Sequence, residues 1–187
     1  MLETDLRPDS DTLTEPVLAW RAWTLFAGAH GRDVRLRPIA GRRGAWPARE
    51  PARASCPRHC RPVPGLDCLC GLHATREPLL LRRARDPSVI GRVALWGRIV
   101  EHELGYRAAF AYPVRLTLVC MLCFWQWGLE RSRADRVARL RGGRLVPLCD
   151  AHVEISNRYG YRTPHLVAAD GVQQALLDSY AVELLPV

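Results

Sequence analysis

The chain has 187 residues and a formal net charge of +8, and all 27 of its Lys and Arg positions are arginine. Its longest apolar run, 116–127, is interrupted by Thr117 and Gln126, so no segment reaches the roughly 20 apolar residues that span a bilayer. The acidic, polar start lacks the apolar region of a secretory signal, and we expect a cytoplasmic protein that does not contact membranes.

The first third of the chain predicts a tail, a hairpin and a long loop. Residues 1–15 lack apolar periodicity, which predicts a mobile tail ahead of a β-rich domain over 16–119. The apolar run 17–26, with tryptophans as core residues, and the alternating run 33–39 are typical of two strands joined by a hairpin loop. The proline-, glycine- and arginine-rich stretch 40–65 disfavours regular structure, and so long a loop needs something to hold it.

A cluster of cysteines and histidines stands at the far end of this loop. Four thiols and two imidazoles fall within eighteen residues, and cysteine pairs in a cytoplasmic chain favour zinc over disulfides. Cys60 in place of the first histidine is an alternative that is nearly as well supported, and His73 is a third option. The ligand set that we favour is Cys56, His59, Cys68 and Cys70.

The clearest strand pattern follows a short segment, 78–85, that fits either a helix or a strand. Apolar residues alternate from position 89, a glycine-containing turn follows Glu103, and the chain returns over 106–112. Because proline disrupts a strand, Pro113 is expected to separate this second strand from a third one over 114–119. The pattern therefore predicts a three-stranded antiparallel meander that leads into a cysteine pair.

A second cluster has the spacing of a structural zinc site. Two ligand pairs, each with two residues between its members, supply four ligands: Cys120, Cys123, Cys149 and His152. The segment after the third cysteine predicts a helix that carries the histidine and stops at Gly160.

Two further helices are predicted around this second cluster. The run 129–140 fits a helix whose capping box is Ser132 with Asp135, and 170–185 fits an amphipathic helix capped by Asp170 and Gln173. Arginines recur along the first of these helices, close to two tryptophans, which favours contact with phosphates and stacking on bases. The predicted nucleic-acid-binding residues are Arg131, Arg133, Arg136, Arg139, Trp125 and Trp127.

Two resemblances accompany these patterns. The segments Trp20-Arg-Ala-Trp23, Cys68-x-Cys70-Gly71-Leu72 and Gly91-x-Val-x-Leu-Trp96-Gly97 resemble a group of uncharacterised bacterial proteins, which implies no activity. The stretch from Cys120 to His152 resembles treble-clef zinc fingers, a class whose members bind nucleic acid, proteins or nothing beyond their zinc.

The sequence thus predicts an α+β protein with an antiparallel β-meander, two structural zinc ions, and a zinc-finger module with a C-terminal helix over 120–187. We expect a binding module rather than an enzyme, because an arginine-rich surface with tryptophans suits nucleic acid. One alternative is a protein-interaction adaptor that uses exposed aromatic residues such as Trp96 and Tyr112. The other is an enzyme with a catalytic zinc ion in the first cluster; no small-molecule substrate is inferred.

Overall fold

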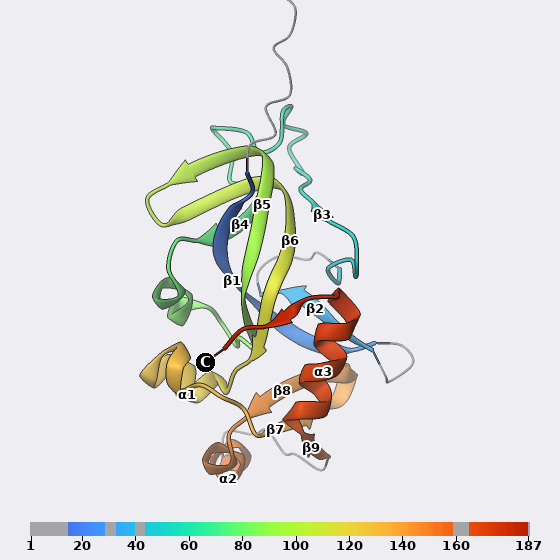
Figure 1. Ribbon diagram of the computed structural model, residues 1–187. Helices are drawn as coiled ribbons and strands as arrows, with labels where there is room; N and C mark the ends of the chain where they lie inside the picture. Colours follow the sequence, from blue (N-terminus) through green and yellow to red (C-terminus); the bar gives the residue numbers. More distant parts are fainter. Residues whose placement is uncertain (1–14, 29–32, 40–43, 159–164, 187) are drawn as a thin grey trace, which may run out of the picture.

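The computed structural model describes residues 15–28, 33–39, 44–158 and 165–186. These residues form an α+β protein made mostly of antiparallel sheet with a few short helices (Figure 1), as the sequence predicts. The predicted tail lies outside the described residues except for Glu15. None of the helices in the described part is long and apolar enough to cross a membrane.

The described strands are joined in one sheet. In chain order they are β1 (Val17–Ala27), β2 (Val34–Pro38), β3 (Ala52–Arg53), β4 (Leu72–Thr75), β5 (Val89–His102), β6 (Gly105–Leu118), β7 (Arg136–Arg139), β8 (Arg144–Leu148), β9 (Leu166–Ala168) and β10 (Glu183–Leu184). The α-helices are α1 (Met121–Trp127), α2 (Asp150–Arg158) and α3 (Ala169–Tyr180), and the 3₁₀ turns are η1 (Pro78–Arg83), η2 (Leu129–Arg131) and η3 (Arg141–Gly143).

The hairpin of β5 and β6 is the centre of the sheet (Figure 1). β1 pairs with β5, β4 pairs with β6, and β4 also meets β1 at Trp20 and Thr75, so these four strands form a closed ring of pairings. The far end of β1 pairs with β2 and β8, and the sheet continues through β7 to β9. Every pairing among the described strands is antiparallel except that of β10 with β6.

The predicted meander consists of two long strands, not three. Pro113 lies inside β6 opposite Val93, and the register shifts by one residue between Val93 and Arg92, which marks a β-bulge. On the other edge of β6, Pro113 falls between the stretch that pairs with β3 and the stretch that pairs with β10. The missing proline N–H is therefore tolerated where the ladder is already interrupted, and the strand continues.

The helix predicted over 129–140 is wrong. The hydroxyl of Ser132 does not cap a helix but donates to the carbonyl oxygen of Leu129 at 2.7 Å, which closes the short turn η2. The chain then becomes strand β7, which lies between β8 and β9 with Val137 and Ala138 buried. Pairing with strands on both sides thus outweighs the local helical tendency of the arginines.

The other two predicted helices are present, and the capping box predicted for the second of them is not formed. The helix after Cys149 is α2, and its predicted end at Gly160 lies outside the described residues. The side chain of Asp135 accepts a hydrogen bond at 3.1 Å from the first backbone N–H of α2. At α3 no side chain caps the first turn, since Gln173 instead accepts from the backbone N–H of Leu118 at 2.8 Å, and the helix ends at Tyr180.

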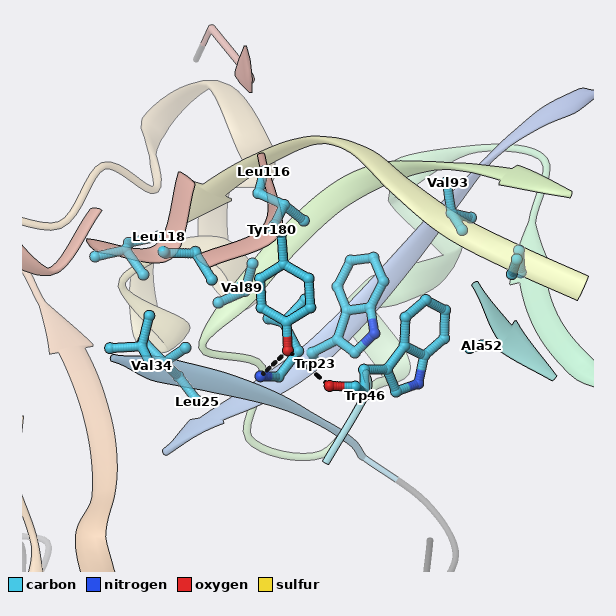
Figure 2. Close-up of a cluster of buried hydrophobic side chains, with 14 of the residues drawn as sticks. Trp23, Leu25, Val34, Trp46, Ala52, Val89, Val93, Leu116, Leu118 and Tyr180 are labelled. Carbon is cyan, nitrogen blue, oxygen red and sulfur yellow. Dashed lines mark hydrogen bonds between the residues drawn. The ribbon is translucent and has the colours of Figure 1, made fainter. Parts of the chain in front are cut away.

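The main core is formed by residues of this ring of strands together with residues of β2, β7, β8 and α3. Trp23 is fully buried, and its ring meets Trp46 edge-on with 5.3 Å between ring centroids. The hydroxyl of Tyr180, from α3, accepts a hydrogen bond from the Leu36 N–H at 2.9 Å and donates one to the Trp46 carbonyl at 3.1 Å (Figure 2). The same cluster includes Val137 of β7, so residues on both sides of position 120 share one core.

We expect Tyr180→Phe to lower the free energy of unfolding by about 1–3 kcal/mol, because it leaves a buried N–H and a buried carbonyl without a partner. Chemical denaturation of both proteins measures the difference. The matched control is Tyr106→Phe, whose hydroxyl bonds to the exposed Arg76 side chain, and which should change stability by less than about 0.5 kcal/mol.

The effect of Tyr180→Phe on stability is expected to depend on pH. Burial raises the pKa of Tyr180, so its contribution to stability is complete below about pH 10 and is lost as the pH rises further. The difference between wild type and Tyr180→Phe should therefore shrink in alkaline solution. Equal stability of the two proteins at neutral pH would contradict this account of the core.

Candidate metal centres

All seven cysteines of the chain gather in two clusters. Their members are Cys56, Cys60, Cys68 and Cys70 in the first centre, and Cys120, Cys123, Cys149 and His152 in the second. Within each cluster, one ligand atom per residue lies within 4.8 Å of all the others. Zinc–sulfur bonds of about 2.3 Å place tetrahedral ligands about 3.7 Å apart, so both clusters fit one ion.

The second centre joins three pieces of the fold. Cys120 lies two residues after the end of β6 and Cys123 lies in α1, whereas Cys149 lies between β8 and α2 and His152 lies in the first turn of α2. The strand and the two helices therefore bring both ligand pairs together. Backbone bonds fix the approach, since the N–H of His152 donates to the carbonyl of Cys149 at 3.0 Å.

The distances in the second centre suit a single ion. The Nδ1 atom of His152 lies 3.4 Å from the sulfur of Cys120, 3.2 Å from that of Cys123 and 3.1 Å from that of Cys149. The sulfurs of Cys123 and Cys149 are 3.6 Å apart. Three thiols and one imidazole at such separations are the donor set of a Cys₃His structural zinc site, and these are the four residues that the sequence predicts.

The first centre is held beside β6 by the strands that precede and follow it in the chain. Cys56 and Cys60 follow β3, which pairs with β6 at Ala52. Cys68 and Cys70 come just before β4, which also pairs with β6. The sulfurs of Cys56 and Cys68 lie 3.7 Å apart. The long loop that lacks regular structure is therefore fastened at its end by a shared strand and a cluster of four thiols.

His59 does not belong to the first centre. Its backbone takes the left-handed conformation with φ of 55°, its N–H donates to the carbonyl of Cys56 at 3.0 Å, and its side chain is exposed. This turn brings the next residue, Cys60, back to Cys56, so the cysteine takes the place that the sequence assigned to the histidine. The third option, His73, lies in β4 with Nε2 at 2.8 Å from the Leu69 carbonyl oxygen and is not part of the cluster.

The surroundings of four of these thiols shift their pKa values. A hydrogen bond from the Cys60 backbone lowers the pKa of Cys56 to about 6, while bonds of the Cys60 thiol to its neighbours raise the pKa of Cys60 to about 12. In the second centre, burial raises the pKa of Cys120 and of Cys123. Because thiolates are the metal ligands, zinc binding at either centre releases protons.

One arginine that no sequence pattern singles out supports the first centre. Arg107 of β6 is 7% exposed, and its guanidinium donates to the carbonyl oxygens of Gly65 and Cys70 at 3.1 Å and to that of Cys68. The strand pattern alone cannot identify it, because an arginine at an alternating position is usually solvated. Its role follows from the loop that packs on it.

The predicted nucleic-acid residues do not share the predicted helix. Arg136 and Arg139 lie at the two ends of strand β7, where Arg136 pairs with Asp150 at 3.0 Å and Arg139 is exposed. Arg133 is exposed, and its backbone bridges to Val119. The ring of Trp125 is half-buried and its Nε1 donates to the Ala84 carbonyl oxygen at 3.2 Å.

Trp127, with Arg131 over its ring, lines a groove beside the second centre. Trp127 is 55% exposed, and the guanidinium carbon of Arg131 lies 5.9 Å from its ring centroid. The groove has a volume of about 440 Å³ and is lined by Trp20, Leu79, Arg82, Phe124, Trp127 and Glu130, among others. Arg92 adds a second cation over an aromatic ring, 4.9 Å from the Trp20 centroid.

Taken together, the described residues offer two four-ligand centres and, beside the second, a groove with two tryptophans. Four protein ligands complete a zinc coordination sphere, as in closed structural sites. Flat aromatic rings with neighbouring guanidinium groups can bind planar or anionic partners. Comparisons of the chain with protein family models, curated proteins and solved structures found no match.

Proposed function

We propose that this protein is a zinc-stabilised module that binds single-stranded nucleic acid in the groove between η1 and α1. The observation that supports it most is the pair of tryptophans in this groove, Trp20 and Trp127, each with an arginine over its ring. Bases stack on aromatic side chains irrespective of sequence, while arginines neutralise the phosphates that connect them.

Zinc in both centres is the structural half of the proposal. The grouping of all seven cysteines with one histidine supports it, because a chain that merely buried its thiols would not divide them into two sets of ligands. The second centre would hold α1, and with it Trp127, beside η1. The presence of four protein ligands in each centre favours structural zinc over a zinc enzyme, which keeps one position open.

A treble-clef arrangement is part of the same proposal. The first ligand pair follows strand β6, the hairpin of β7 and β8 comes next, and the second pair spans the start of α2. A knuckle, a hairpin and a helix in this order are what the resemblance of this stretch to treble-clef fingers implies.

The charge around the groove supports an anionic partner. Arg82 lines it and donates to the backbone carbonyls of Trp125 and Gln126, so its guanidinium is fixed at the wall. Arg131 lies over the ring of Trp127, which lines the groove, and Glu130 is the acidic residue among the lining side chains. The net charge of +8 would attract a polyanion from a distance, and the local arginines would then hold it.

Binding of a fluorescent single-stranded oligonucleotide tests the proposal. We expect the logarithm of the affinity to fall linearly with the logarithm of the salt concentration, and Trp127→Ala to weaken binding about tenfold, because stacking contributes about 1–3 kcal/mol per base. The matched control is Arg37→Ala, which removes an arginine over the ring of Phe26 outside this groove and should bind like wild type. Absence of binding to both DNA and RNA at low salt would contradict the proposal.

A second candidate function is a protein adaptor, and one observation favours it. Leu66 and Leu69 beside the first centre are 68% and 85% exposed, and Leu69 lines a mostly apolar cleft of about 580 Å³. The aromatic residues expected for this role are less accessible: Trp96 stacks on Phe110 at 6.1 Å, and the hydroxyl of Tyr112 donates to the Tyr180 carbonyl. An adaptor would therefore use the leucines of the metal loop.

A further inference from the structure

We propose that Arg107 is the buried counter-ion of the first metal centre, and that this centre carries two negative charges when a divalent zinc ion is bound. The inference rests on the zinc-binding half of the proposed function and is independent of nucleic acid. It assigns a positioning role to a residue that lies outside both ligand sets. It also explains how a guanidinium can stay charged inside the protein.

Within the described part of the chain, the side chain of Arg107 donates its hydrogen bonds to the loop that carries the ligands. Its Nη1 atom donates to the carbonyl oxygens of Gly65 and Cys70, each at 3.1 Å, and to that of Cys68. Two of these three acceptors belong to residues whose thiols form the first centre. The guanidinium thus fixes the backbone from which two ligands extend, in the way that outer-shell groups orient metal ligands.

No carboxylate among the described residues pairs with the charge of Arg107. Its side chain is 7% exposed, and the ion pairs among the described residues do not include it. Carbonyl oxygens satisfy its donors but carry no net charge, and a buried cation without an anion is strongly disfavoured. Four thiolates around one divalent ion leave two negative charges, which supply the missing anion a short distance away.

Further arginines surround the same centre. A hollow of about 390 Å³ is lined by Arg58, Arg61 and Arg98 together with Cys60 and Cys68, and one acidic residue, Asp67, lines it. The Nε of Arg98 donates to the Pro64 carbonyl oxygen at 2.9 Å. Such an excess of positive charge suits a dianionic Cys₄ centre better than a Cys₃His centre with one negative charge.

Gly71 allows the loop to lie against Arg107. Its backbone has φ of +125°, which favours glycine, and a Cβ atom at this position would stand 3.0 Å from the Cβ of Arg107 and 3.1 Å from that of Pro64. The glycine after Cys70 therefore allows the metal loop to pack closely against β6.

Zinc competition with a chromogenic chelator tests the inference, with the second centre as internal reference. We expect Arg107→Met, which keeps the apolar stem and removes the charge, to weaken zinc binding at the first centre about 10- to 100-fold and leave the second unchanged. Arg107→Lys keeps the charge but loses the contact with three carbonyl oxygens. Its zinc affinity at the first centre should lie between those of wild type and Arg107→Met. The control Arg98→Met removes an exposed arginine beside the same centre and should change the affinity less than either.

A thermodynamic cycle separates charge compensation from packing. The free energy of unfolding is measured with and without Arg107→Met, first in the zinc-loaded chain. It is then measured in a Cys60→Ser, Cys68→Ser background, which cannot bind zinc at the first centre. The loss of stability should be large in the loaded chain and small or reversed in the other, because there the arginine has no anion. Equal losses in both, or unchanged zinc affinity, would overturn the inference while leaving zinc at both centres. A wild-type chain with zinc at the second centre alone would overturn it together with the zinc assignment of the first.

Discussion

Cys149→Ser is expected to abolish zinc binding at the second centre and to unfold the unit made of β7, β8 and α2. Structural zinc contributes about 10–16 kcal/mol of apparent binding free energy in small zinc-binding peptides, which exceeds the whole stability of many domains. Cys149 lies between β8 and α2 and shares the ion with the pair after β6. Its loss leaves three ligands on two separate segments.

The packing around the second centre cannot replace the ion. The buried cluster there consists of Cys120, Ala138, Val146 and Leu148, so one of its four members is itself a ligand and another is an alanine. So few buried side chains supply little apolar stabilisation. The unit is otherwise held by the metal, by Val137 and Leu145 in the main core, and by its pairing with β1 through Leu25 and Phe26.

Zinc per chain, measured by elemental analysis, should fall from two to one in Cys149→Ser, with a loss of helical circular dichroism. His152→Ala should act in the same direction. His165→Ala replaces an exposed histidine of the same module that is not a ligand and should keep both ions. Two zinc ions in Cys149→Ser would contradict the assignment of this centre.

Local chemistry explains which parts of the fold the sequence predicts. The strands at 17–26 and 33–39 and the helix after Cys149 are confirmed, because their patterns reflect local alternation and a ligand-bearing turn. The ligand pairs of the second centre are grouped as predicted because their spacing is itself the requirement of the ion. Such features need no knowledge of distant neighbours.

The sequence predictions fail where contacts with distant parts of the chain determine the local structure. β7 forms because β8 and β9 lie on both sides of it, and β9 comes almost thirty residues later in the chain. Pro113 stays in β6 because the neighbouring strands leave a gap beside it. Arg107 and Trp20 acquire their roles from loops that pack on them, the metal loop in one case and η1 with α1 in the other. None of these contacts is encoded in the nearby sequence.

The spacing of the residues leaves open whether Cys60 or His59 is a ligand of the first centre. A pair of neighbouring substitutions decides between them. Cys60→Ser is expected to lower zinc from two ions per chain to one, because it removes a thiol that lies within 4.8 Å of the other three ligand sulfurs. His59→Ala should keep both ions and change stability by less than about 0.5 kcal/mol, since its side chain is exposed.

The reason for this contrast is the turn between Cys56 and Cys60. The left-handed backbone of His59 reverses the chain so that the following thiol meets Cys56 while the imidazole points to solvent. His59→Gly relieves the cost of that conformation and should bind zinc at least as well as wild type. Elemental analysis and chelator competition on the three variants measure these outcomes. Loss of one ion in His59→Ala, with both kept in Cys60→Ser, would restore the histidine as the ligand and leave the first centre with one negative charge in place of two.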